Sequence, residues 1–377
     1  MTKTTLEDLR GQLTDCDDEI IKLIALRQSL VNKIGRCKRD TGRPTRDYRR
    51  ETIVFENARR AAQCYGVDPD VAHAVLARLI RYSLSRQENL RAQALAQGVG
   101  RRALIIGGLG KMGRWFAGFL ENQQYSVELA DPGQSPSRFA NHGDWKALDL
   151  HGYDLILVAT PLDTTRQTLL ALAEVQPRGI VMDIASVKSP LKPAYARLLA
   201  RGCKVVGIHP MFGPDARLLA DKHLLVVDTG CESAKTMAME LFAPTMVRVV
   251  SMDLAQHDRQ IAWLLGLSHA LNICFLTALA ASGRRASELA DSSSTTFEAQ
   301  LEIATGVARE SAALYFEIQH ANPYNSTAIA ALQQAIGTLG ETLAKHDREA
   351  FIALMHGARD YLAEHAQAKS RHKQTAT

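Results

Sequence analysis

The chain has 377 residues, of which 46% are hydrophobic and 23% charged, so a mainly disordered protein is excluded and two or three domains are expected. The N-terminus lacks the apolar stretch of a secretory signal, and no uncharged apolar run reaches the ~18 residues of a membrane span. The six cysteines form no CxxC pair, which disfavours metal and redox motifs. We therefore expect a soluble, cytoplasmic protein without a membrane partner, in which the longest apolar run, around 261–279, is a buried helix.

The formal net charge of +5 lies entirely in residues 1–100, which hold 18 Lys and Arg against 13 Asp and Glu. Two interpretations are open, a nucleic-acid surface or a pocket for small anions. The segment has no helix-turn-helix spacing and only four aromatic side chains for base stacking, so we favour the pocket and expect no nucleic-acid partner.

Residues 4–40 are predicted to form one long helix. Apolar side chains recur at alternating steps of three and four from Leu6 to Cys37, which is the spacing of a coiled-coil seam. Further helices are expected over 46–65 and 69–96. Because a first helix about 50 Å long does not fit easily into a small compact monomer, we predict a homodimer that shares it.

Arg27 interrupts this apolar seam. A charge there costs free energy unless it is paired, so Arg27 either sets the helix register or receives an anion. Lys38 follows eleven residues later, about 20° around the helix, and so shares the face of Arg27. The shared face favours an anion receptor within the helical bundle.

From residue 103 onward, short apolar segments alternate with helical ones, which predicts a doubly wound parallel sheet up to about residue 250. Strands then vanish, and an Ala/Leu-rich helical region continues to about residue 367. The predicted units are an all-α domain (1–96), a linker (97–102), a Rossmann-type α/β domain (103–250), an all-helical dimerisation and substrate domain (251–367) and a flexible tail (368–377).

A glycine motif, Gly108-x-Gly110-x-x-Gly113, follows the first predicted strand of the α/β domain and opens a helix. Asp131 ends the next strand, 23 residues after Gly108. This context predicts a dinucleotide site, with the pyrophosphate at the helix N-terminus. Asp131 would accept from a ribose 2′-hydroxyl and repel a 2′-phosphate, which favours NAD over NADP; the alternative is a glycine turn without a ligand.

Two further strand ends carry candidate side chains. His209, in the sequence GIHPMFGPD, ends a strand between turn-forming residues, which suits a general base better than a structural histidine. Ser186 and Lys188, in DIASVK, either hold a substrate carboxylate or form a helix cap with an exposed lysine.

These motifs resemble those of two enzyme families. The similarity to prephenate dehydrogenase lies in GGLGKMG, DIASVK, GIHPMFGP and HDRQIAWLLGLSH, and that to the enteric all-helical chorismate mutase domain in LEDLRGQL, ALRQSLVNKIGRCK and RDYRRE. In this order, and over nearly the whole chain, they resemble the bifunctional chorismate mutase/prephenate dehydrogenases of tyrosine biosynthesis. The resemblance implies conversion of chorismate to prephenate, NAD-dependent oxidative decarboxylation of prephenate to 4-hydroxyphenylpyruvate, and feedback by tyrosine.

The resemblance also implies site residues. The mutase would bind a small dicarboxylate in a compact conformer, with Arg10 entering from the partner subunit and Lys38 and Gln87 contacting the ether oxygen. Its full set is Arg10, Arg27, Lys38, Asp47, Arg50, Glu51, Ser83 and Gln87. In the dehydrogenase, His209 would take the proton of the C4 hydroxyl as hydride leaves for NAD. The implied cofactor contacts are Gly108, Leu109, Gly110, Met112, Gly113, Asp131, Thr160 and Pro161.

Two positions depart from the dehydrogenase family. Ala159 replaces the serine that hydrogen-bonds the catalytic histidine, and Gln300 replaces the arginine that binds the ring carboxylate. Both changes alter the surroundings of the substrate, so a second hypothesis is action on 4-amino-4-deoxychorismate and 4-amino-4-deoxyprephenate, giving 4-aminophenylpyruvate. A third is a non-catalytic dimer that senses NAD or another ligand, against which the complete mutase set argues.

Overall fold

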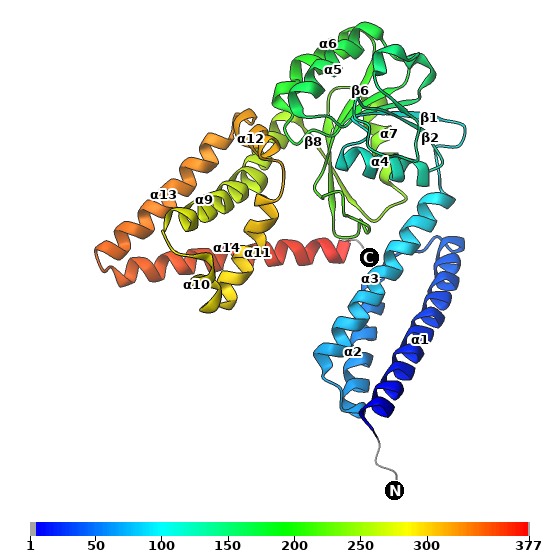
Figure 1. Ribbon diagram of the computed structural model, residues 1–377. Helices are drawn as coiled ribbons and strands as arrows, with labels where there is room; N and C mark the ends of the chain where they lie inside the picture. Colours follow the sequence, from blue (N-terminus) through cyan, green and yellow to red (C-terminus); the bar gives the residue numbers. More distant parts are fainter. Residues whose placement is uncertain (1–4, 376–377) are drawn as a thin grey trace.

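The computed structural model describes residues 5–375, and the side chains of residues 5–368. It begins with three long helices, α1 (Leu6–Asp40), α2 (Tyr48–Tyr65) and α3 (Pro69–Ala94), which stand together below the rest of the molecule (Figure 1). Thr5 and Asp8 form a capping box at the start of α1, and Asp47 caps α2. Gly66 ends α2 in the left-handed conformation, with φ of 68°. The predicted helical N-terminal domain is confirmed.

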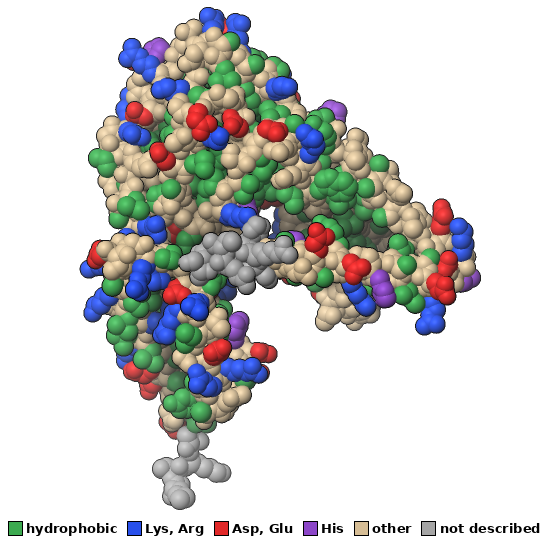
Figure 2. All heavy atoms as spheres, turned by 180° about the vertical axis from the view of Figure 1, so that it is seen from behind, with side chains coloured by type: hydrophobic (Ala, Val, Ile, Leu, Met, Phe, Trp, Pro, Cys, Tyr) green, Lys and Arg blue, Asp and Glu red, His purple; other side chains and the backbone are tan. Residues whose placement is uncertain are grey.

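The apolar seam of α1 is uncovered in the single chain. Leu6 and Leu13 are 64% and 62% exposed, and Gly35 is the only residue of α1 that is buried. Figure 2 shows apolar side chains on the surface of this helical region. A seam of this kind needs a second surface to bury it.

An eight-stranded sheet forms the centre of the chain, in the order β3-β2-β1-β4-β5-β6-β7-β8. Its strands are β1 (Arg102–Ile106), β2 (Ser126–Ala130), β3 (Asn141–His142), β4 (Leu155–Val158), β5 (Ile180–Asp183), β6 (Lys204–Pro210), β7 (His223–Asp228) and β8 (Arg248–Asp253). Short 3-10 helices occur at Trp145–Ala147, Leu150–Gly152 and Ser189–Leu191. The central strands β1, β4 and β5 are almost wholly buried, as expected for a sheet covered on both faces.

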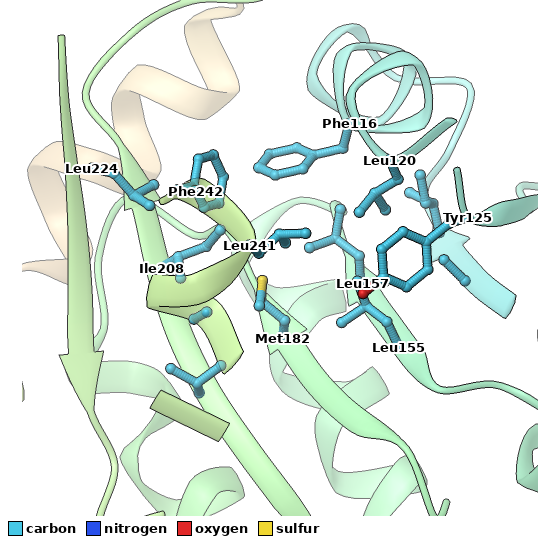
Figure 3. Close-up of a cluster of buried hydrophobic side chains, with 14 of the residues drawn as sticks. Phe116, Leu120, Tyr125, Leu155, Leu157, Met182, Ile208, Leu224, Leu241 and Phe242 are labelled. Carbon is cyan, nitrogen blue, oxygen red and sulfur yellow. The ribbon is translucent and has the colours of Figure 1, made fainter. Parts of the chain in front are cut away.

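Helices cover both faces of this sheet. On one face α4 (Lys111–Asn122) and α7 (Glu232–Phe242) share an apolar cluster, in which Phe116 and Phe242 lie over Leu157 and Met182 (Figure 3). On the other, α5 (Leu162–Val175) and α6 (Lys192–Ala200) bury Leu169 and Leu198. This is the predicted doubly wound α/β architecture.

The doubly wound sheet was predicted to be parallel, and this is wrong at one edge. The first six strands in the order of the sheet, from β3 through β1 to β6, run parallel. Strand β7 is antiparallel to β6, and β8 is parallel to β7. The connection from β6 to β7, residues 211–222, contains no helix. A short connection without a crossover helix joins antiparallel neighbours, whereas a parallel pair requires the longer crossover.

The described part of the chain after β8, residues 254–375, is helical and extends sideways from the sheet (Figure 1). Its elements are α8 (Leu254–Ile261), a π-helix (η4, Ala262–Leu267), α9 (Ser268–Ala281), α10 (Ala286–Asp291), α11 (Thr295–Ala308), α12 (Ala312–Ala321), α13 (Asn325–Ala344) and α14 (Arg348–Thr375). A helical C-terminal region was predicted and is confirmed, but α14 continues to Thr375 and so includes residues 368–375, which were predicted to form a flexible tail.

The expectation that the apolar run around 261–279 is buried is wrong for the single chain. Residues Leu254–Ala281 are long and apolar enough to cross a membrane by length and composition, which is weak support for a span, and only 11% of the most apolar window is buried. Helix α11 packs on α9, but Leu264 and Leu271 remain about half exposed. One chain therefore has too few helices here to cover this surface.

Candidate active sites

The glycine loop has the geometry that close approach of a dinucleotide requires. After β1 the chain turns at Gly107, whose φ is +80°, and Gly110 begins α4 as its N-cap. A Cβ atom on Gly113 would lie 2.3 Å from the carbonyl oxygen of Gly107. Only glycine lets the helix pack this closely against the turn, which leaves the helix N-terminus open to an anion.

The other predicted cofactor residues gather around this loop. The carboxylate of Asp131, at the end of β2, accepts hydrogen bonds from the backbone N–H groups of Leu109 (3.1 Å) and Gly133 (2.9 Å). Thr160 follows β4 and lies close to Gly107, and Pro161 is the N-cap of α5. Met112 lies in the first turn of α4. The structure thus brings the predicted set together at the carboxyl ends of three neighbouring strands, where α/β sheets bind ligands.

His209, at the end of β6, belongs to a buried chain of three side chains. Its Nδ1 lies 3.0 Å from Nε2 of His257, and Nδ1 of His257 lies 2.7 Å from Oδ1 of Asp258. The carboxylate of Asp258 also accepts from the backbone N–H groups of Lys188 (3.0 Å) and Ser189 (2.6 Å). His209 is 4% exposed, and His257 and Asp258 are fully buried.

The order of these contacts assigns the ring protons. Burial raises the pKa of Asp258, but the hydrogen bonds from His257, Ser189 and Lys188 outweigh burial and leave the pKa below its ordinary value. Asp258 is therefore a carboxylate that accepts a hydrogen bond from His257 Nδ1. Nε2 of a neutral His257 is then an acceptor, and His209 must donate to it through Nδ1. The remaining nitrogen of His209, Nε2, carries a free lone pair, which is what a general base requires.

Burial also keeps His209 uncharged. Desolvation, the neighbouring His257 and the Lys188 ammonium lower the pKa of His209 well below its ordinary value. A neutral imidazole at neutral pH is able to accept a proton.

Lys188 does not have the surroundings that were predicted for it. Its ammonium is fully buried and donates to Asp183 Oδ1 (2.5 Å) and to the carbonyl oxygen of Ile208 (2.9 Å). Tyr195 donates to the other oxygen of Asp183. Through Ile208, this buried ion pair holds the backbone of the residue next to His209. Because the ammonium already has these partners, direct binding of a substrate carboxylate by Lys188 is disfavoured. Ser186 is half-buried on the same loop.

Sequence reasoning missed the roles of His257 and Asp258. Both belong to the motif HDRQIAWLLGLSH, which supported the family resemblance, but no function was predicted for them. They lie 48 and 49 residues from His209 in the sequence, and only the packing of α8 on β7 and β8 brings them close. The adjacent His-Asp pair was the available signal.

The two positions that depart from the dehydrogenase family, Ala159 and Gln300, lie in different parts of the fold. Ala159 follows β4 and has no side-chain group for a hydrogen bond to a histidine. His257 contacts His209 instead. Gln300, on α11, donates through Nε2 to Oδ1 of Asn272 on α9 at 2.8 Å, so it forms part of the C-terminal helical region.

A second site lies between α1 and α3. Arg27 Nη1 donates to Ser83 Oγ (2.8 Å), and Gln87 Nε2 donates to the carbonyl oxygen of Val31 (3.2 Å). A Cβ atom on Gly35 would lie 3.1 Å from Gln87 Cγ, so glycine admits the glutamine side chain. Burial lowers the pKa of Arg27, and among the described side chains no carboxylate lies within ion-pair distance of it. A partly desolvated guanidinium without a counterion is suited to bind an anion.

The remaining predicted residues of this site lie at the C-terminal end of α1 and at the start of α2. Lys38 donates to the carbonyl oxygen of Thr45 (2.8 Å), and burial lowers its pKa although Asp47 and Glu51 oppose that shift. Asp47 accepts from the backbone N–H of Arg50 (2.9 Å), whose side chain is exposed. Lys38 lies in the last turn of α1, eleven residues after Arg27, whereas Asp47 and Arg50 belong to the first turn of α2 and its cap.

Two more arginines of the helical domain lie apart from Arg27. Arg46, which was not predicted, forms a forked ion pair with Glu51, at 2.9 and 3.1 Å. Arg10 is exposed on α1, 17 residues or about 25 Å before Arg27, so one chain does not bring these two together. A contribution of Arg10 to the pocket requires a second subunit.

The fold and both sites define a two-part protein, a helical anion pocket joined to an α/β dehydrogenase. Residues 9–88 match the family "Chorismate mutase type II", and residues 137–250 match "Prephenate dehydrogenase, nucleotide-binding domain". The chain therefore belongs to the bifunctional family that joins a chorismate mutase to a prephenate dehydrogenase.

Several known proteins are similar to this chain. The T-protein of Enterobacter agglomerans is 27% identical, with 96% of this chain and 94% of the relative covered. The 4-amino-4-deoxyprephenate dehydrogenase of Streptomyces pristinaespiralis is 29% identical, over 70% of this chain and 92% of the relative. Among solved structures, prephenate dehydrogenase from A. aeolicus, in complex with hydroxyphenyl propionate and NAD+, has a TM-score of 0.60 at 18% identity, over 70% of this chain and 98% of that one, and so shows a shared fold.

Proposed function

We infer that the protein rearranges chorismate to prephenate in its helical domain and oxidises prephenate to 4-hydroxyphenylpyruvate, with loss of carbon dioxide, in its α/β domain. One observation carries this inference. A single chain holds both a partly buried guanidinium at Arg27, which has no carboxylate partner among the described side chains, and a neutral, oriented imidazole at His209. The T-protein relatives match over almost the full chain, which supports the same pair of activities.

The mutase step requires no proton transfer. A dianion has to be held in a chair-like conformer while one C–O bond breaks and one C–C bond forms, and charge on the ether oxygen has to be stabilised. Arg27, Lys38 and Gln87 supply donors at this site, and Arg10 would come from the partner subunit. Ser83 and Glu51 hold their neighbours in place, and Asp47 and Arg50 complete the proposed substrate contacts.

The dehydrogenase step requires a base and a hydride acceptor. We propose NAD as the cofactor, because the glycine loop and Asp131 fit a dinucleotide and the A. aeolicus structure holds NAD+. NAD, when bound, would supply the acceptor for the hydride that leaves C4. His209 Nε2 accepts the C4 hydroxyl proton, and His257 and Asp258 stabilise the positive charge that develops on its ring. Loss of the ring carboxylate as carbon dioxide leaves an aromatic product.

We also propose that residues 1–96, 103–250 and 251–367 act as mutase, nucleotide-binding and dimerisation units in a cytoplasmic homodimer. The uncovered seam of α1 supports this, as do exposed side chains on the C-terminal helices, such as Ile336 and Leu343. Ser186 and Gln300 are proposed to line the prephenate site.

Subunit mixing tests the shared mutase site. Arg10→Ala and Arg27→Ala homodimers are both expected to lack mutase activity, because each site would need one arginine from each subunit. After unfolding and refolding of an equimolar mixture, half the molecules should be heterodimers with one intact site each, so about one quarter of the wild-type activity should return. The measurement is chorismate consumption, with each variant refolded alone as the control. No recovery would mean that Arg10 and Arg27 serve the same subunit's pocket.

A second candidate function is supported by Ala159 and by the Streptomyces pristinaespiralis relative. An amino group at C4 would carry its own lone pair and need different hydrogen-bond partners from a hydroxyl group, so a site without the family serine suits such a substrate.

Parallel assays distinguish the candidates. We expect NADH formation with a higher kcat/KM for prephenate than for 4-amino-4-deoxyprephenate, measured at equal NAD concentration, and chorismate alone should also yield NADH. A large preference for the amino compound would replace our first choice. NADH from neither compound would favour a ligand-sensing dimer.

A further inference from the structure

The segment that follows His209 is attached to the mutase domain. Residues 211–222 connect β6 to β7, and they begin two residues after His209. Ser85 Oγ of α3 donates to the carbonyl oxygen of Arg217 (2.6 Å), and Glu88 Oε2 of α3 accepts from the backbone N–H of Leu219 (2.9 Å). Residues 211–222 are called the β6–β7 loop below.

Glu88 joins this loop to a second one. Its other oxygen, Oε1, accepts from the backbone N–H of Met246 at 2.5 Å, just before β8. Glu88 is 3% exposed, and burial raises its pKa although the two backbone donors oppose the shift. A carboxylate that satisfies two buried backbone N–H groups holds both loops in one position.

The same helix also builds the mutase site. Ser83 and Gln87 point toward α1, where they contact Arg27 and Val31. Ser85 and Glu88 lie on roughly the opposite face, at about 100° per residue, and point toward the α/β domain. One rigid helix thus contacts both sites without sharing a side chain between them.

A second link starts from the segment before α2. Arg46, which pairs with Glu51 of the mutase site, also donates to Asp221 of the β6–β7 loop at 2.5 Å. Asp221 adopts a left-handed conformation, with φ of 64°. The loop is therefore held at its middle and near its C-terminal end by mutase side chains.

Apolar packing does not complete this domain interface. A cavity of about 490 Å³ lies between α3 and α4, bordered by Ser85, Glu88, Trp115 and Leu219. Because apolar side chains do not fill this space, the hydrogen bonds of Ser85 and Glu88 contribute more to holding the β6–β7 loop against the mutase domain.

We propose that Glu88 is a positioning residue of the dehydrogenase that the mutase domain supplies: it holds the β6–β7 loop, and through it the end of the strand that bears His209. The proposal rests on the proposed function, because it concerns the turnover of the same dehydrogenase site. Glu88 contacts neither substrate nor cofactor in this scheme.

The test uses Glu88→Gln in the full-length protein. The amide of the introduced glutamine has one acceptor oxygen where glutamate has two. Its NH2 group would therefore face one of the two backbone N–H donors, Leu219 or Met246, and could not accept from it. We expect dehydrogenase kcat to fall about tenfold, as for loss of one charge-assisted hydrogen bond. The KM for prephenate and the mutase kcat/KM should stay within about twofold, since Ser83 and Gln87 face away. Glu56→Gln, at an exposed position on α2, is the matched control.

Hydrogen exchange of the backbone supplies a readout that general destabilisation would not reproduce. In Glu88→Gln, peptides covering 211–222 and 243–247 should exchange faster, whereas those covering β1 should be unchanged. Ser85→Ala, which removes one hydrogen bond and little volume, should show a smaller effect on residues 211–222 alone.

The outcomes are separable. Wild-type kcat in Glu88→Gln, or equal loss of both activities with faster exchange throughout the chain, would overturn the proposal. An inactive wild-type protein would instead contradict the proposed function.

Discussion

Replacement of His209 by Asn is expected to lower the dehydrogenase kcat by about 10²–10⁴-fold, the usual contribution of a general base. Asparagine keeps a polar group of similar size next to His257, so substrate affinity should change little. The measurement is NADH formation from prephenate. Mutase activity in the same preparation reports on folding, and His151→Asn, at an exposed histidine, is the matched control. A fully active His209→Asn variant would refute the base role of His209.

The pH profile follows from the same residue. Burial, His257 and Lys188 lower the pKa of His209, so its basic form persists at neutral pH and the rate should fall only at a pH well below the ordinary histidine range. Stability should change in the same direction. In the unfolded chain His209 would bind a proton below about pH 6.5, whereas the folded protein keeps it neutral, so the free energy of unfolding should decrease as the pH falls through that value.

Replacement of Arg27 by Ala is expected to abolish the chorismate rearrangement, with a loss of about 10²–10³-fold or more, because the site would lose a preorganised cationic donor. NAD binding and prephenate oxidation should survive, since Arg27 lies in the helical domain. The variant should fold, because its substitution removes a partly desolvated charge that has no carboxylate partner among the described side chains.

Chorismate consumption and NADH formation from prephenate, measured on one sample, check this result. Arg59→Ala, at an exposed arginine of α2, is the control for general loss of positive charge. Unchanged mutase activity in Arg27→Ala would exclude the proposed pocket.

Much of the fold could be predicted because its signals are local. The seam spacing of residues 6–37, the glycine turn after β1 and the alternation of apolar strands with helices each depend on neighbouring residues, and the three regions follow from them. The direction of β7 could not be read in this way. Its residues are as apolar as those of a parallel strand, and only the helix-free β6–β7 connection decides its direction.

The residues of the candidate sites could also be predicted only in part from the sequence. The glycine loop and Asp131 were predictable, since they form one continuous strand–turn–helix–strand unit. Lys188 was predicted either to hold a substrate carboxylate or to be exposed beside a helix cap, whereas in the structure its ammonium is buried against Asp183, which no local pattern indicates. The charge excess of the first hundred residues suggested an anion pocket, but not that Arg46 uses its charge on Glu51 and Asp221.

By itself, the sequence determined the class of each domain and the residue types available for chemistry, because helix periodicity, strand hydrophobicity and turn-forming glycines act over a few residues. Only the tertiary structure decided which of those residues act together. It placed His257 and Asp258 behind His209, which leaves Nε2 of His209 as the nitrogen proposed to act as the base, and it turned Glu88 away from α1 toward the β6–β7 loop. These contacts join positions from 48 to more than 130 residues apart, a separation at which packing, and no local pattern, sets the distance.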